Sequence, residues 1–260
     1  MKFLSIKQIN IYFLILVCYT KDISAKMRLI MKKWTLIAFV TLLCFGLIGC
    51  SPKVVNLEKV ESNELQFIKP QQGDTVATIK TDLGDIKVIL YPQYAPLAVE
   101  NFVSLSQKGY YNGVKFHRVI EDFIIQSGDP TGTGTGGNSI WELPFSDEFS
   151  DKLHHYSGAL SMANSGEDTN RSQFFIVTSS PKNINDEIVT LMQQAGWRED
   201  IINTYKQAGG SPDLDYRYTV FGQVYEGLEI AFQINGEKTD EHDMPKKDII
   251  IQSIEISVIE

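Results

Sequence analysis

One long stretch, residues 114–137, restricts what this chain can fold into. In its first half, β-branched and aromatic residues alternate with polar ones, which predicts a β-strand. Strict alternation places Val114, Phe116, Arg118 and Ile120 on one face. An arginine in an apolar row is costly to bury unless it meets a partner or a ligand. The pattern alone therefore leaves two readings of Arg118 open, a structural ion pair and a functional guanidinium.

The second half of the stretch, Thr131 to Gly137, is rich in glycine. A phosphate-binding loop needs a strand before it, a helix after it and usually a lysine nearby. Here Ser139-Ile140-Trp141 follows, and no lysine is close in sequence. We therefore interpret this segment as a flexible turn that packs close to other backbone.

Charge is distributed unevenly along the 260 residues. Residues 1–50 hold seven of the 24 Lys and Arg but one of the 32 Asp and Glu, which leaves 17 basic and 31 acidic residues elsewhere, a net charge of −14. This balance argues against nucleic acid and anionic lipid surfaces as partners of the folded part. All three cysteines, Cys18, Cys44 and Cys50, precede residue 51. The rest of the chain therefore has no thiol for a disulfide or a metal site.

The four histidines, His117, His154, His155 and His242, show no metal-ligand spacing. The adjacent pair could bind a metal weakly, but we expect it to be solvated. The sequence predicts neither a metal nor a cofactor.

Residues 1–50 have the features of a targeting leader. Two lysines after Met31 precede an apolar run at 34–48 that is short for a membrane span, and Leu47-Ile48-Gly49-Cys50 resembles a bacterial lipobox. That resemblance implies lipidation of the Cys50 sulfur and an anchor in a lipid bilayer, at the extracytoplasmic face of a bacterial membrane. Residues 1–30 hold a second apolar run. It is either an over-extended gene start, which we favour, or part of a two-segment membrane region.

The remaining chain predicts a polar tether followed by a mainly β domain. We expect the tether at 51–74, a hairpin at 75–91, a helix from Pro96 to Lys108, and strands at 156–162, 216–224 and 249–259. A second short helix should start near Glu226. In the strand after the polar loop 164–171, Gln173 and Phe175 should share one face and Phe174 and Ile176 the other.

Several blocks of this sequence resemble the signature of the cyclophilins, the cyclosporin-type peptidyl-prolyl isomerases. The matching residues are Phe116-His117-Arg118-Val119-Ile120, Phe123-Ile124-Ile125-Gln126, Gly128-Asp129, Ser161-Met162-Ala163-Asn164, Ser172-Gln173-Phe174-Phe175-Ile176, Leu214-Asp215 and Val220-Phe221-Gly222. The resemblance implies a closed eight-stranded antiparallel barrel over 75–260 with two capping helices. Residues 180–212 depart from the compact pattern. They predict a helical insertion near 183–208, capped by Asn183 or Asn185, that packs on the barrel or alternatively contributes to substrate choice.

The resemblance also implies site residues and an activity. Arg118, Gln126 and Phe123 would be catalytic, and the substrate-binding residues would be Met162, Ala163, Asn164, Gln173, Phe175, Leu214 and Tyr218. The spacing of the catalytic set requires a bend near Glu121-Asp122. The implied function is peptidyl-prolyl isomerisation in proline-containing polypeptides, assisting the folding of exported proteins. The alternative is a surface lipoprotein that binds proline-rich segments without turnover, as a chaperone or adhesin.

Three residues depart from the family pattern. Glu121 replaces a common proline at the bend, so the bend should be less rigidly set. Asp213 stands where the best-known eukaryotic members have tryptophan, and Tyr218 where they have histidine. We therefore expect weak cyclosporin binding, with catalysis retained.

Overall fold

The structure is a computed structural model, and it describes residues 55–260. The described residues belong to one compact unit, Pro52–Glu260, and the lipobox and Cys50 lie outside them. The strands are β1 (Thr75–Thr81), β2 (Gly84–Leu90), β3 (Val114–Lys115), β4 (Arg118–Ile120), β5 (Ile124–Ser127), β6 (Ala159–Met162), β7 (Phe174–Val177), β8 (Val220–Glu226) and β9 (Ile250–Val258). The α-helices in this part are α3 (Pro96–Gln107), α4 (Asp186–Gln194), α5 (Glu199–Ala208) and α6 (Leu228–Asn235).

The strands form one antiparallel sheet in the order β3-β9-β1-β2-β8-β6-β7-β5-β4. Its two ends, β3 and β4, are consecutive pieces of one chain segment, separated by Phe116 and His117. The Phe116 N–H donates to Ile249 beside β9, and the His117 N–H donates to Gln126 on β5. Counted as one strand, β3 and β4 close the sheet on itself with eight strands, as the resemblance implies.

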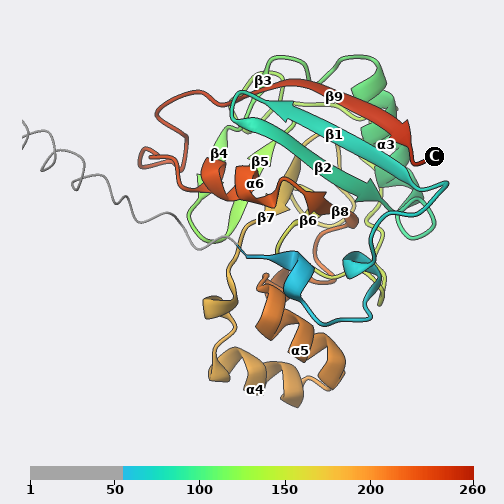
Figure 1. The fold of residues 1–260 in the computed structure, drawn as a ribbon. Helices are drawn as coiled ribbons and strands as arrows, with labels where there is room; N and C mark the ends of the chain where they lie inside the picture. Colours follow the sequence, from blue (N-terminus) through green and yellow to red (C-terminus); the bar gives the residue numbers. More distant parts are fainter. Residues whose placement is uncertain (1–54) are drawn as a thin grey trace, which may run out of the picture. The chain divides into compact units, whose positions relative to one another are not determined.

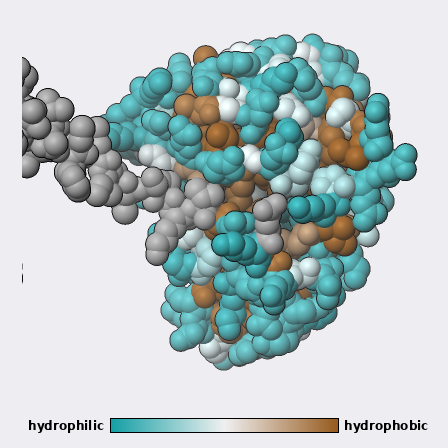
Figure 2. All heavy atoms as spheres, viewed as in Figure 1, coloured by the Kyte–Doolittle hydropathy of each residue, from teal (hydrophilic) through white to brown (hydrophobic). Residues whose placement is uncertain are grey.

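The barrel interior is filled by aromatic and aliphatic side chains from the sheet and from two helices. Phe102 of α3 lies at the centre, with its ring 5.4 Å from Phe174 of β7 and 5.3 Å from Phe221 of β8. Phe232 of α6 belongs to the same cluster. The two expected capping helices are thus confirmed as α3 and α6. The described surface in Figure 2 is mostly hydrophilic, with hydrophobic residues in separate patches.

The face pattern expected for residues 114–120 is wrong in its second half. Val114 and Phe116 are buried, and Phe116 belongs to the barrel interior, but the next interior side chain is Val119, so the alternation changes phase between β3 and β4. This shift keeps Arg118 out of the apolar interior, where an uncompensated guanidinium would be costly. The strand expected at 216–224 also starts later, because Tyr216 has a left-handed backbone (φ 59°) and β8 begins at Val220.

The insertion predicted near 183–208 is confirmed as α4 and α5, which lie together at one end of the molecule (Figure 1). Of the two cap candidates, Asn185 caps α4, and its side chain accepts a hydrogen bond from the Ile188 N–H.

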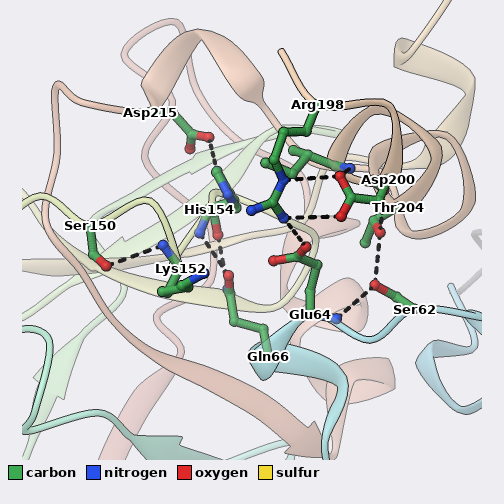
Figure 3. Close-up of polar contacts among 11 residues, drawn as sticks. Ser62, Glu64, Gln66, Ser150, Lys152, His154, Arg198, Asp200, Thr204 and Asp215 are labelled. Atoms are coloured by element: carbon green, nitrogen blue, oxygen red, sulfur yellow. Dashed lines mark hydrogen bonds and ion pairs between the residues drawn. The ribbon is translucent and has the colours of Figure 1, made fainter.

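Residues 57–67 are packed against the domain, which differs from the polar tether expected at 51–74. Gln66 is 4% exposed, and its amide exchanges hydrogen bonds with the backbone of His154 (2.7 and 2.9 Å). Glu64 accepts from Arg198 at 2.6 Å, next to the Arg198–Asp200 pair (Figure 3). This segment therefore joins the insertion to the barrel. The hydropathy pattern missed it because its buried groups are polar and find partners far away in sequence.

Candidate active site

A row of side chains from three neighbouring strands forms the first part of the site. Arg118 of β4 lies opposite Gln126 of β5, which lies opposite Phe175 of β7. Directly paired residues of antiparallel strands point to the same face, so the guanidinium and the phenyl ring share one face of the sheet. The Phe175 face and the Phe174 face separate as the alternation predicted, because Phe174 and Ile176 are in the barrel interior.

Hydrogen bonds hold this row without enclosing the arginine. The Arg118 Nη1 lies 3.5 Å from Gln126 Oε1, and its Nε lies 3.8 Å from an Asp243 carboxylate oxygen. Gln126 Nε2 donates to Gln173 Oε1 at 2.9 Å. The Arg118 side chain is 42% exposed. Its contacts are long and its fork of five donors is accessible from solvent, so it can turn toward a bound carbonyl or amide.

An apolar cluster, which we call the hollow, lies beside this row. It is formed by Phe123, Ile124, Phe175, Leu214 and Tyr218, which pack in one cluster. The Tyr218 ring meets the Phe175 ring edge-on at 5.5 Å. Such a hollow, walled by aromatic and aliphatic groups, suits the pyrrolidine ring of a proline.

The expected bend near Glu121-Asp122 is a three-residue turn between β4 and β5. Ile120 pairs with Ile124, and Asp122 has a left-handed backbone (φ 56°). The Asp122 carboxylate accepts from the Ser180 N–H at 2.8 Å, and its own N–H donates to Asn235 at 2.7 Å. These contacts from two distant segments set the turn, so Phe123 is fixed without the proline that Glu121 replaces.

Met162 does not take its expected place in the hollow. Its side chain is 0% exposed and belongs to the barrel interior with Phe174. Ile124, which is not among the predicted site residues, belongs to the hollow instead. The signal was present in the alternation, since Ile124 stands two residues before Gln126 and so shares its face.

Ala163 and Asn164 lie at the end of β6, next to the hollow. The Ala163 N–H donates to the Gln173 carbonyl at 3.0 Å, so a peptide would have to use the Ala163 carbonyl instead. The Asn164 side chain donates to Asp147 and to the Arg217 carbonyl, at 3.2 and 3.1 Å. Its amide thus braces two loops, and its backbone is the part that could meet a peptide.

The glycine-rich segment 131–137 is organised by one carboxylate, Asp129. Its oxygens accept from the backbone N–H groups of Thr131, Thr133, Gly134 and Gly136 at 2.7–3.1 Å. Burial alone would raise the Asp129 pKa, but these hydrogen bonds and that of the Thr131 hydroxyl outweigh it and lower the pKa to about 2.

The segment that Asp129 organises supports the catalytic row through Gln173. The Gln173 amide donates to the carbonyls of Gly134 and Gly136, at 3.1 and 2.8 Å. Asp129 therefore positions Gln173, which in turn holds Gln126.

Replacing Asp129 with asparagine is expected to lower the free energy of unfolding by about 1.5–3 kcal/mol, because an amide presents a donor to N–H donors. Isomerase activity should fall several-fold as Gln173 loses its fixed partners. Since the folded-state pKa lies below the unfolded one, the wild-type contribution is complete above about pH 4 and is lost as the pH falls toward 2. Urea unfolding at pH 7 and pH 3 checks this, and equal stability of the two proteins at pH 7 would contradict it.

The histidine pair is buried, so the expectation that it is solvated is wrong. His154 and His155 are 2% and 1% exposed, and the Nδ1 of each lies 2.7 Å from an Asp215 oxygen. The Tyr205 hydroxyl of α5 donates to the same carboxylate at 2.9 Å. Burial would raise the Asp215 pKa, but the hydrogen bonds from both histidines outweigh it and lower the pKa. The His155 ring stacks on Phe175 at 6.0 Å, so this cluster backs the hollow.

Comparison with known proteins places this chain in a family. The family model described as cyclophilin type peptidyl-prolyl cis-trans isomerase/CLD matches residues 76–256. A Staphylococcus aureus (strain USA300) protein named "Putative peptidyl-prolyl cis-trans isomerase" is 45% identical over 186 residues, 72% of this chain and 93% of the relative.

A longer relative and a solved structure agree with that match. A Streptococcus pyogenes protein named "Putative bifunctional phosphatase/peptidyl-prolyl cis-trans isomerase" is 47% identical over 201 residues, 74% of this chain, and the match spans 42% of that relative. The crystal structure of a Cryptosporidium parvum cyclophilin type isomerase aligns with a TM-score of 0.59 and 34% identity, covering 72% of this chain and 99% of that one. The chain therefore belongs to the cyclophilin family of peptidyl-prolyl cis-trans isomerases.

Proposed function

We propose that Arg118 carries out catalysis by stabilising the twisted amide of an X–Pro bond. Rotation about this bond crosses a barrier of about 20 kcal/mol and takes tens to hundreds of seconds unaided. In the twisted state amide resonance is lost, and the proline nitrogen becomes pyramidal and basic. A fixed cation near that nitrogen stabilises the twisted state more than either planar state, which lowers the barrier.

The observation that carries this proposal is the shared face of Arg118, Gln126 and Phe175 beside the apolar hollow. A proline ring seated between Phe123 and Phe175 would present its amide to the guanidinium. Gln126 would hold the arginine and contact the substrate carbonyl. The step makes and breaks no covalent bond, so no nucleophile, metal or cofactor takes part in it. The intact arginine favours an enzyme over a binding module without turnover.

We further propose proline-containing segments of exported polypeptides as the substrates. One cyclophilin that aligns with this chain was crystallised in the presence of the dipeptide Ala-Pro, at 34% identity and a TM-score of 0.56. Pro52–Glu260 is a compact unit with its own core, and the match covers 93% of the S. aureus relative, so we expect this unit to fold on its own. The unit should accelerate cis-to-trans conversion of a proline tetrapeptide, and a rate equal to the uncatalysed one would overturn the assignment.

The place of action in this proposal is the extracytoplasmic face of a bacterial membrane, through lipid on Cys50. The leader pattern and the lipobox support it. Among residues 55–260, no helix is long and apolar enough to cross a bilayer.

Replacing Cys50 with serine in the full chain is expected to abolish incorporation of a labelled fatty acid. The thiol is the attachment atom, and a hydroxyl does not substitute for it. Cys44→Ser, six residues earlier, is the matched control and should label normally. Labelling of the Cys50 variant at the level of the control would refute the anchor.

Cyclosporin binding is proposed to be weak because Asp213 is an exposed carboxylate where an indole would supply apolar contact. Asp213→Trp is expected to strengthen inhibition of the isomerase by cyclosporin about tenfold, or ~1.4 kcal/mol. Asp213→Asn removes the charge without adding an aromatic ring and should change inhibition much less. Identical inhibition of all three proteins would show that residue 213 does not set affinity for the drug.

A further inference from the structure

The helical insertion borders an open cavity of about 490 Å³ that the catalytic row does not use. It lies between α4 and the turn that carries Phe123, and residues 210–213 border it. Its volume falls within the range of pockets that hold small ligands or several side chains.

The cavity wall formed by α4 is apolar and open. Ile188, Leu191, Met192 and Ala195 recur at helical spacing and all line it. Met192 is buried, but Leu191 is 54% exposed, one of the most exposed large apolar side chains in the described residues. Trp197 lines the cavity as well. Figure 2 shows hydrophobic groups at the surface over this part of the molecule. A leucine held open in an apolar cavity indicates a surface that gains from being covered.

The cavity borders the proline hollow. Phe123 lines both, and Pro212 and Asp213 of the cavity immediately precede Leu214 of the hollow. An extended peptide advances about 3.3–3.6 Å per residue. A polypeptide whose proline occupies the hollow can therefore place a side chain one to three residues away in the cavity.

We propose that this cavity is a second substrate subsite, which accepts a large apolar side chain such as leucine, methionine or phenylalanine within three residues of the isomerised proline. The inference rests on the proposed function, since it presumes that the hollow holds that proline. The exposed carboxylate of Asp213 at the rim disfavours an acidic residue at the same position of the peptide. The insertion thus selects sequences around the proline.

The test compares alanine-based proline peptides that carry one leucine at each position from three before to three after the proline. Binding of each peptide is measured by isothermal titration calorimetry on Pro52–Glu260, and isomerisation is measured on the same peptides. We expect the best leucine peptide to exceed the all-alanine peptide about tenfold in affinity, the lower end of what burial of a leucine contributes. The gain in affinity should occur when leucine stands at one particular peptide position, and not at the others.

Leu191→Glu should reduce the ratio of affinities for the leucine and the all-alanine peptide to about one, because the new carboxylate places a charge on the apolar wall. Gln193→Glu is the matched control: it adds the same charge to an exposed position of α4 outside the cavity, and it should keep the wild-type ratio. A wild-type ratio near one at every position, or an unchanged ratio in Leu191→Glu, would overturn the subsite. If the leucine peptide still binds more tightly but no peptide is isomerised, the proposed function is overturned and the subsite is not.

Discussion

Replacing Arg118 with alanine is expected to lower kcat/KM for a proline tetrapeptide by about 100- to 1000-fold, the range seen when one preorganised transition-state donor is removed. The guanidinium shares the face of Gln126 and Phe175, with long contacts that leave its donors accessible. Because the side chain is 42% exposed and lies outside the barrel interior, the variant should remain folded. A protease-coupled isomerase assay gives the rate, and thermal unfolding gives the stability.

Two further variants separate geometry from charge. Arg118→Lys keeps a cation but loses the planar fork, so its rate should lie between those of the wild type and the alanine variant. Lys115→Ala removes a positive charge three residues away, from the exposed pair with Asp248, and should leave the rate unchanged. If Arg118→Ala isomerises the peptide as fast as Lys115→Ala does, the proposed mechanism has no basis.

Replacing Asp215 with asparagine is expected to lower the free energy of unfolding by about 3–5 kcal/mol, as when one member of a buried charged cluster is removed. Four donors converge on its two oxygens: Nδ1 of His154, Nδ1 and the backbone N–H of His155, and the Tyr205 hydroxyl. The asparagine amide has one acceptor oxygen, and its NH₂ group is a donor. Some of the four donors would therefore face this NH₂ group and lose their hydrogen bonds. For a unit of this size, the midpoint of thermal unfolding should fall by roughly 6–20 °C.

Asp213→Asn is the matched control, because the same change two residues earlier affects an exposed carboxylate and should alter stability by less than about 0.5 kcal/mol. Acid provides an independent check. The folded-state pKa of Asp215 is lowered, so its contribution is present above about pH 4 and is lost as the pH falls through the folded-state value. Equal midpoints for the two asparagine variants at pH 7 would contradict the role assigned to this cluster.

Much of the fold could be predicted because its information is local. The alternation of Gln173, Phe174, Phe175 and Ile176 predicts which side chains enter the barrel and which lie on the outer face beside the hollow. The structure agrees. Helix α3 begins at Pro96, as the sequence predicts, because a proline fits the first helical turn.

The remaining features depend on partners that are distant in sequence. The Asp215 cluster joins residues 10, 60 and 61 positions apart, and a histidine pair in a polar stretch gives no local sign of burial. Gln66 and His154 are 88 positions apart, so the sequence gives no local sign that they pack together. Met162 was assigned to the hollow by position in a motif, whereas the register of β6 turns it into the barrel.

The most direct test of the central claim measures binding and turnover on the same complex. Exchange spectroscopy by NMR on a proline peptide with the wild type and with Arg118→Ala gives the dissociation constant and the rate of cis-trans exchange while bound. If Arg118 acts on the twisted amide, the bound exchange rate falls by at least about 100-fold, whereas affinity changes by less than about threefold. A loss of affinity that accounts for the entire loss of rate would show that Arg118 merely binds the peptide, and it would contradict the account.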